Sequence, residues 1–521
     1  LWVAPLSYAA LFAPLGVAFA AAQRLIGRAD WNRIAMIALG TLAWLGPLAS
    51  SGRIALASVV VLALGLSVTA NRLVPQDPRR REVIWRGAVV LLALVAIVGM
   101  SVEYGTRWRE ERAAAALPPA AAGAPNLLVV IVDTLRADRL ATYGYRRGAT
   151  PVMTRLAAEG VQFDWALAAS SWSLPSHVSM LTGYMPATHG AEIDMYDGRF
   201  PTLAQALLAR GYRTAAISAN TLVFSIAQGF GRGFLRFDDS FYSRIDGLTR
   251  TMLGRRLHKA VASALGWDYI PVKRYAADVT RQAIEWVDQR GNRPFFLMLN
   301  YFDVHDPEAQ PSGATGDAYD DAVADVDRAI GTLVDHLETA GLLDDTVLVI
   351  LSDHGESLGQ HGLGGHGTSL YIEQLHVPLI LRFPSRVPGG RRVSTPVSLT
   401  SLPNTLLDLA GLTAPNPFPG RSLAPTWREV DTRLTWPIPR SELRYRPWQH
   451  TLENQDLLRS LFEWPWHYIG HSRAEDELFN VAEDPGETRN LAGQPDHADQ
   501  LERLRHELAT PGDRVEHSGT P

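Results

Sequence analysis

Four apolar runs in the middle of this 521-residue chain constrain its fold more than any other feature. They are residues 127 to 132, 214 to 218, 295 to 300 and 347 to 352. The first is unbroken and rich in β-branched residues, which is typical of a strand buried on both faces of a parallel sheet. Helical patterns alternate with these runs, at residues 203 to 210, 276 to 290 and 321 to 341. The alternation predicts a doubly wound α/β domain.

Polar side chains follow each of these runs at its carboxyl end. They are Asp133, Asn220, Asp303, His305, Asp353 and His354. In an open α/β sheet, ligands bind in the crevice at the carboxyl ends of the strands. We therefore expect these four separate segments to meet at one site.

A fifth segment, residues 170 to 183, predicts a nucleophile at the start of a buried helix. Pro175 suits the first helical turn, Ser176 could cap the helix, and apolar residues follow. Ser173 would then lie beside the free N–H groups and the positive dipole of a helix N-terminus. A hydroxyl in this position suits attack on a phosphate or sulfate ester.

Asp133, Asp353 and His354, with the Ser173 oxygen, form a mixed oxygen and nitrogen ligand set for a divalent metal ion. One imidazole beside carboxylates favours Zn or Mn, while Ca and Mg stay open. Such an ion would lower the pKa of the Ser173 hydroxyl and neutralise oxygens of the ester.

Two further histidines are candidates for the same site. His366 lies in a glycine-rich loop twelve residues after His354, where it could bind a second ion or the leaving group, or simply lie on the surface. His305 could donate a proton to the leaving oxygen or to the transferred group, or could have a structural role.

The first hundred residues predict a membrane domain. Apolar stretches at 1 to 21, 34 to 50, 54 to 71 and 87 to 102 are each long enough to cross a hydrocarbon layer roughly 30 Å thick. The loops after the first and third stretches are rich in arginine, whereas the loop between the second and third has only Arg53. The positive-inside rule places the remaining chain outside the cytoplasm, in the periplasm or beyond the cell. Because the chain begins with Leu1, we expect a segment to precede it.

Composition narrows the class of partner. The chain has no cysteine, so neither disulfides nor thiolate metal sites contribute. The formal charge of −5, without a basic block in the part after the apolar stretches, argues against nucleic acid. We divide the chain into a membrane domain (1–102), a linker (103–125), a catalytic α/β domain (126–435) and a C-terminal subdomain (436–521). The sequence leaves the oligomeric state open.

The motifs resemble those of the sulfatase family of the alkaline phosphatase superfamily over residues 126 to 492. Residues 132 to 138, Val-Asp-Thr-Leu-Arg-Ala-Asp, resemble its first metal-ligand motif. Residues 173 to 183 resemble its nucleophile motif, 352 to 356 its second metal-ligand motif, and 478 to 491 its C-terminal strand and turn. The resemblance implies a two-subdomain α/β fold, with a smaller C-terminal α+β part, and metal-dependent attack on a sulfate or phosphate ester.

The chain departs from that family at several positions. The family oxidises its nucleophile to formylglycine within a motif that has arginine where this chain has His177, which argues against formylglycine at Ser173. Thr134 replaces the second aspartate of the first motif, and Asn220 and His366 lie near where active-site lysines are expected. We therefore assign catalysis to Ser173, His305 and His177. Substrate binding is assigned to Asn220, Asp303 and His366.

Two alternatives stay open beside a membrane-anchored hydrolase of a sulfated or phosphorylated glycan or lipid. The membrane domain and unmodified hydroxyl are similar to phosphoethanolamine transferases and lipoteichoic acid synthases, which implies phosphoryl-group transfer onto an envelope lipid or glycan. The third reading is a catalytically inactive protein that binds an anionic glycan. Retention of every metal ligand argues against this last reading.

Overall fold

The computed structural model describes residues 79, 86, 90, 105, 107–192, 194–239, 274–305, 317–412, 416–428, 436–444 and 457–510. The chain forms two compact units, Leu1–Arg112 with Phe241–Lys273, and Ala113–Ser240 with Arg274–Pro521. The architecture below is that of the second unit. The four predicted membrane spans lie outside the described residues, apart from isolated positions. In the part that is described, no helix is long and apolar enough to cross a membrane.

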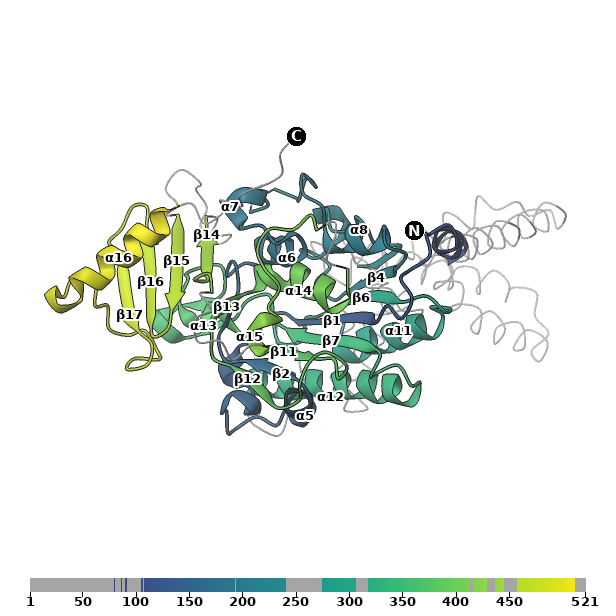
Figure 1. The fold of residues 1–521 in the computed structure, drawn as a ribbon, viewed down its shortest axis with the longest axis horizontal. Coiled ribbons are helices and arrows are strands. Elements are labelled where there is room, and N and C mark those ends of the chain that lie inside the picture. Colours follow the sequence, from purple (N-terminus) through teal and green to yellow (C-terminus); the bar gives the residue numbers. More distant parts are fainter. Residues whose placement is uncertain are drawn as a thin grey trace. The chain divides into compact units, whose positions relative to one another are not determined.

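An eight-stranded mixed sheet forms the centre of the second unit (Figure 1). Its order is β12 (Arg391–Val393), β2 (Val161–Phe163), β11 (Leu379–Arg382), β7 (Thr346–Leu351), β1 (Asn126–Val132), β6 (Phe295–Tyr301), β4 (Arg213–Ser218) and β5 (Arg236–Asp238). The four predicted runs are the neighbours β7, β1, β6 and β4, which pair in parallel. Strand β11 runs antiparallel to both of its neighbours, so the predicted α/β sheet is confirmed but is mixed.

Helices cover both faces of this sheet (Figure 1). One face carries α6 (Ser173–Thr182), α8 (Leu203–Leu208) and α14 (Leu402–Leu409). The other carries α5 (Pro151–Glu159), α11 (Ala276–Asp288) and α12 (Ala318–Thr339). Alternate residues of β1 point to opposite faces, so its uninterrupted apolar sequence contributes to both cores.

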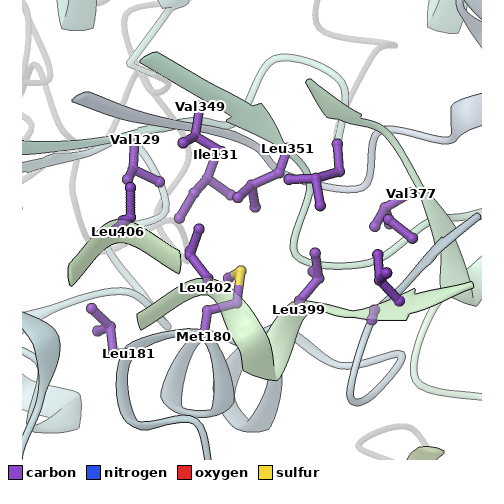
Figure 2. Close-up of a cluster of buried hydrophobic side chains, with 14 of the residues drawn as sticks. Val129, Ile131, Met180, Leu181, Val349, Leu351, Val377, Leu399, Leu402 and Leu406 are labelled. Carbon is purple, nitrogen blue, oxygen red and sulfur yellow. The ribbon is translucent and has the colours of Figure 1, made fainter. Parts of the chain in front are cut away.

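The core beneath α6 fixes the helix that carries the proposed nucleophile. Figure 2 shows Met180 of α6 and Leu402 of α14 facing Ile131 of β1 and Leu351 of β7. Each such side chain contributes roughly 1.5–3 kcal/mol when it is fully buried. Packing therefore holds α6 against the carboxyl-terminal halves of β1 and β7.

A second, four-stranded antiparallel sheet lies in the C-terminal part, with α16 (Ala498–Ala509) packed on it (Figure 1). Its strands are β14 (Arg440–Leu443), β15 (Leu458–Glu463), β16 (Trp466–His471) and β17 (Glu477–Asn480). The C-terminal part therefore combines strands and a helix, as the resemblance implies. The predicted domain boundaries themselves stay predictions.

Short elements complete the described part of the second unit. Two small sheets contain β10 (His376–Val377), β3 (Ala166–Leu167) and β13 (Val397–Ser398), and β8 (Ser357–Leu358) with β9 (Gly364–Gly365). The short helices are α7 (Pro186–His189), α13 (Ile372–Leu375) and α15 (Pro425–Arg428). The 3-10 turns are η1 (Ala137–Arg139), η2 (Ala141–Tyr143), η3 (Ile226–Gln228), η5 (Gln360–Gly362), η6 (Leu399–Ser401) and η8 (Pro495–His497).

Candidate active site

The carboxyl ends of β1 and β7 bring together three side chains that could bind a metal. Asp133 directly follows β1, and Asp353 and His354 follow β7 after one intervening serine. Their ligand atoms lie within 4.8 Å of one another, and all three residues are buried. The two strands are adjacent in the sheet, so parallel pairing itself places the motifs side by side.

Each aspartate has one oxygen held by the protein and one without a hydrogen bond. Oδ2 of Asp133 accepts from Nδ2 of Asn220 at 3.0 Å and from Nδ2 of Asn300 at 3.2 Å. Oδ1 of Asp353 accepts the Thr134 N–H at 3.3 Å. Asp133 Oδ1 and Asp353 Oδ2 have no hydrogen-bond partner in the described structure. Buried carboxylate oxygens without partners are costly, so these two atoms indicate a place for a cation.

The geometry of His354 directs its free nitrogen to the same place. Nδ1 lies 2.9 Å from the Gly355 carbonyl oxygen, which can only accept, so Nδ1 carries the proton. Nε2 then presents a lone pair and lies 2.9 Å from Ser173 Oγ. Burial, followed by the neighbouring His366, lowers the pKa of His354 well below its ordinary value and keeps the ring neutral. Two carboxylates, a neutral imidazole and a hydroxyl fit a divalent cation such as zinc or manganese.

Helix α6 begins at Ser173, as the sequence predicts. The helix has no side-chain cap at its N-cap residue, Trp172. The prediction that Ser176 caps the helix is wrong, because its hydroxyl donates to the Asp353 carbonyl oxygen at 2.6 Å. That bond joins the first turn of α6 to the second metal-ligand motif. Ser173 is nearly fully buried, so access to its hydroxyl must come from the site itself.

His177 lies one turn further along α6, with its ring fully buried. Its Nδ1 donates to the Ser173 carbonyl oxygen at 2.8 Å and also lies 3.4 Å from Asp353 Oδ2. Its Nε2 lies 3.4 Å from Nδ2 of Asn300, and the ring stacks on Phe224. These contacts give His177 a positioning role beside the site. Its predicted catalytic role stays a prediction.

Asn300 is a site residue that the sequence analysis missed. Its Nδ2 contacts both Asp133 Oδ2 and His177 Nε2, and its Oδ1 accepts the Asn220 N–H at 3.0 Å. It therefore links β6 to the end of β1, the start of α6 and the end of β4. The available signal was a polar residue inside the otherwise apolar run of β6, rather than after it.

Asn220 and Asp303, predicted to bind substrate, both have structural contacts. Asn220 donates a hydrogen bond from Nδ2 to Asp133, and its Oδ1 accepts the Val223 N–H at 3.0 Å. Asn220 therefore supports the metal ligand Asp133. Asp303 is buried, and its Oδ1 accepts the Ala276 N–H at the first residue of α11. Substrate binding by either residue stays a prediction.

Thr134, where a second aspartate is expected, adopts an unusual backbone conformation. Its φ of 62° is in the left-handed region, which is disfavoured for a β-branched residue. This conformation aims its N–H at Asp353, while its hydroxyl donates to the Asp133 carbonyl oxygen at 2.6 Å. The position therefore orients the second motif through its backbone.

The rings of His354, His366 and His305 lie in one group beside Ser173. The centroid of His366 is 4.5 Å from that of His354 and 4.8 Å from that of His305. Nδ1 of His366 lies 3.2 Å from the carboxylate of Glu356, a residue that the sequence analysis did not single out. Burial opposes protonation of His366, but the Glu356 hydrogen bond and carboxylate charge outweigh it and raise its pKa. The ring is therefore placed to present a proton near the site.

Comparison with known proteins decides the family. The family model described as Sulfatase matches residues 125–412, and the one described as N-sulphoglucosamine sulphohydrolase, C-terminal, matches residues 359–513. The chain belongs to the sulfatase family. It is therefore a hydrolase whose family depends on a metal, and Asp133, Asp353 and His354 form its candidate metal site.

Individual relatives are distant. The mouse steryl-sulfatase is 27% identical over 424 residues, which cover 60% of this chain and 67% of the relative. The N-acetylglucosamine-6-O-sulfatase of Bacteroides thetaiotaomicron is 23% identical, over a match that covers 73% of this chain and 85% of the relative. Among solved structures, the phosphonate monoester hydrolase of Agrobacterium radiobacter superimposes with a TM-score of 0.60 at 20% identity, over 74% of this chain and 96% of its own. This last likeness shows the shared fold.

Proposed function

We propose that the protein is a membrane-anchored, metal-dependent hydrolase that cleaves sulfate esters of a glycan outside the cytoplasm. One observation carries the chemical part of the proposal. The two unpartnered oxygens of Asp133 and Asp353 and the lone pair of His354 converge where Ser173 presents its hydroxyl. The glycan part rests on the relative that acts on N-acetylglucosamine-6-O-sulfate groups and on the matched sulphohydrolase region.

Asp133, Asp353 and His354 would hold the cation, with the Ser173 oxygen as a fourth ligand. When bound, a divalent cation lowers the pKa of a neighbouring hydroxyl and offsets negative charge on the ester. Ser173 is the proposed nucleophile, and the free N–H groups at the start of α6 favour the developing anion. His305 and His366 are the proposed proton donors to the leaving oxygen.

The linker enters the central sheet at the edge opposite to the candidate active site. The linker joins the sheet at Asn126, the amino end of β1, whereas Asp133 follows its carboxyl end. Seven strand residues separate the two edges by about 20 Å. The candidate active site and the point where the linker enters the sheet therefore lie at opposite ends of β1.

A second candidate, phosphate-ester hydrolysis or transfer to an envelope lipid or glycan, is favoured by the surroundings of Ser173. His177, in place of the family's arginine, contacts the Ser173 carbonyl and offers no fixed positive charge to guide modification of that serine. An unmodified serine suits phosphoryl transfer, because water or an acceptor hydroxyl can attack phosphorus to release the enzyme. A sulfated serine is harder to discharge.

One experiment separates the two candidates. The purified full chain is incubated with an aryl sulfate, a phosphate monoester and a phosphodiester, and the peptide covering residues 156–199 is weighed by mass spectrometry. Sulfate-ester turnover supports the first proposal and phosphodiester turnover the second. An encoded mass would mean that Ser173 acts unmodified, whereas an aldehyde or its hydrate would overturn that expectation and favour sulfate. No turnover of any ester by metal-loaded protein would contradict both candidates.

A further inference from the structure

A large cavity lies at the edge of the central sheet opposite to the candidate active site. Its volume is about 800 Å³. Its walls come from the linker around Gly123–Asn126, the loop between α11 and β6, and the segment after β11. Nothing in the proposed chemistry of Ser173 uses this cavity.

Three arginines line the cavity, and each is held by backbone carbonyl groups. Arg290 donates to the Val287 carbonyl oxygen at 3.0 Å, and Arg386 donates to that of Asp408 at 3.2 Å. Across the described residues, none of Arg290, Arg293 and Arg386 forms an ion pair with a carboxylate. Asp345 is the acidic residue in the lining, so three positive charges and one negative charge leave the wall with a net charge of +2.

Arg293 also fixes the wall that the linker provides. It donates to the carbonyl oxygens of Leu117 at 3.0 Å and of Pro118 at 2.8 Å. The linker passes close to Gly211 there, whose φ is 84° and where a Cβ would approach the Pro118 oxygen to 2.5 Å. Arg293 therefore holds the linker in place as one wall of the cavity. The guanidinium groups of Arg290 and Arg386 each use one nitrogen in these backbone bonds and keep further N–H donors for a ligand.

We propose that this cavity, the arginine cavity, binds the phosphate group of an anionic lipid headgroup. Guanidinium groups match phosphate oxygens with paired hydrogen bonds, and uncompensated positive charge in a polar hollow favours an anion. The lipid source rests on the proposed membrane anchoring. Seventeen residues separate the end of the last predicted span, at 102, from Ala120 on the cavity wall. Even fully extended, they reach at most about 60 Å, and a helical stretch at 107–115 shortens that reach.

Hydrogen exchange of the full chain tests the proposal in two arms. The first adds inorganic phosphate to protein in neutral detergent. The second compares nanodiscs of phosphatidylcholine alone with nanodiscs that also contain an equal share of phosphatidylglycerol. We expect phosphate, and phosphatidylglycerol, to slow exchange about tenfold in peptides covering 285–294 and 383–390. These peptides do not include the candidate active site, so phosphate bound at Ser173 does not give this signal.

Matched variants assign the effect to the arginine cavity. The double variant Arg290→Gln/Arg386→Gln should lose the protection in both arms, while Arg293 is left to hold the linker. The control Arg146→Gln/Arg147→Gln removes the same amount of charge from two exposed residues before α5. This control should keep the protection from exchange. Both variants should hydrolyse a soluble ester as the parent protein does, so failure of this proposal and failure of the catalytic proposal are distinguishable.

The outcomes are separate. Protection in both arms that only the cavity variant abolishes supports the proposal. Protection by inorganic phosphate alone would overturn the lipid source and assign the cavity to a soluble phosphate. Absence of protection in both arms, or equal loss in the control variant, would overturn the site itself.

Discussion

Two regions of the second unit bury histidines beside carboxylates, and only one of them has the features of a catalytic site. The first is the metal-site cluster, Asp133, Asp353 and His354. The second, which we call the C-terminal junction, joins the catalytic region to the four-stranded sheet. It consists of His361, Ile372, Glu373, His467 and Glu487.

In the C-terminal junction both oxygens of the central carboxylate have donors. Oε1 of Glu487 lies 2.5 Å from His467 Nδ1, and Oε2 accepts the Ile372 N–H at 2.8 Å. The Glu487 carbonyl oxygen also faces His361 Nε2 at 3.1 Å. In the metal-site cluster, by contrast, one oxygen of each aspartate has no hydrogen-bond donor in the described structure. Burial and residue type are thus shared, and the convergence of unpartnered ligand atoms is what distinguishes a site for a ligand.

The largest expected effect tests the metal-site cluster. Asp353→Asn keeps the size of the side chain and its place beside Thr134 but removes the charge. We expect stoichiometric metal to be lost and kcat/KM to fall on the order of 10³-fold or more, because charge stabilisation of the ester is lost with the ion. Metal analysis and kinetics of the folded variant measure both. Full metal content with unchanged turnover would remove Asp353 from the site.

The C-terminal junction should respond in stability instead. Glu487→Ala leaves His467 and the Ile372 N–H without their buried acceptor, so the free energy of unfolding should fall by about 3 kcal/mol. Metal content, and activity per folded molecule below the melting transition, should stay at the parent level. Thermal unfolding and metal analysis of the same sample measure the stability and the metal content. Metal loss from this variant would break the comparison, since the junction would then contribute to the site.

Local patterns were sufficient to predict the ends of strands but not the contacts between them. Asp133, Asp353 and Ser173 were predictable because each follows a strand or begins a helix in a recognisable run. Asn300 was missed because its partners lie on three other elements, and chain order does not show which strands are neighbours. Strand β11 is only four residues long, and nothing in so short an apolar run indicates an antiparallel direction.

The contacts of the C-terminal junction could not be predicted from the sequence either. Residues 478 to 491 were recognised as a motif, yet the role of Glu487 depends on His467 and Ile372, which reach it through the fold. The same limit applies to Asn220, which follows its strand, because its hydrogen bond to Asp133 depends on the fold. Position after a strand predicts proximity to a site, whereas the role depends on which atoms remain without partners.

A smaller effect is expected at Asn300, which supports the metal-site cluster without belonging to it. Asn300→Leu keeps the volume but removes the bonds to Asp133 and His177. We expect metal affinity to fall by about 10–100-fold, as for other residues that orient a metal ligand, while saturating metal restores most of kcat. A merely structural role would lower the melting temperature without moving the metal dissociation constant. Asn490→Leu, in the loop after β17 and away from the metal-site cluster, makes the same substitution where the side chain accepts the Leu478 N–H, and serves as the control.

The smallest effect tests whether an unpartnered carboxylate oxygen outside a cluster marks function at all. Glu192 is buried, and its Oε2 has no hydrogen bond, although Arg444 lies 3.5 Å away. Burial, which outweighs the attraction of Arg444, raises the pKa of Glu192 to about 7. Between the ordinary pKa of 4.5 and this value the unfolded chain ionises and the folded chain does not, so the carboxyl makes the protein less stable as pH rises.

Glu192→Gln removes that penalty, which is fully present above about pH 7 and absent below about pH 4.5. After a discount for partial solvent access, the variant should be more stable than the parent by about 1–2 kcal/mol at about pH 8, with no such gain near pH 4.5. Urea unfolding at the two pH values measures this, with the exposed Glu483→Gln as a control that should show no pH-dependent difference. Metal content and turnover should not change, because Glu192 is not part of the group of metal-ligating side chains found among the described residues, Asp133, Asp353 and His354. If the variant instead loses metal or activity, a single unpartnered oxygen is enough to mark a functional residue, and the rule drawn from the two clusters is too strict.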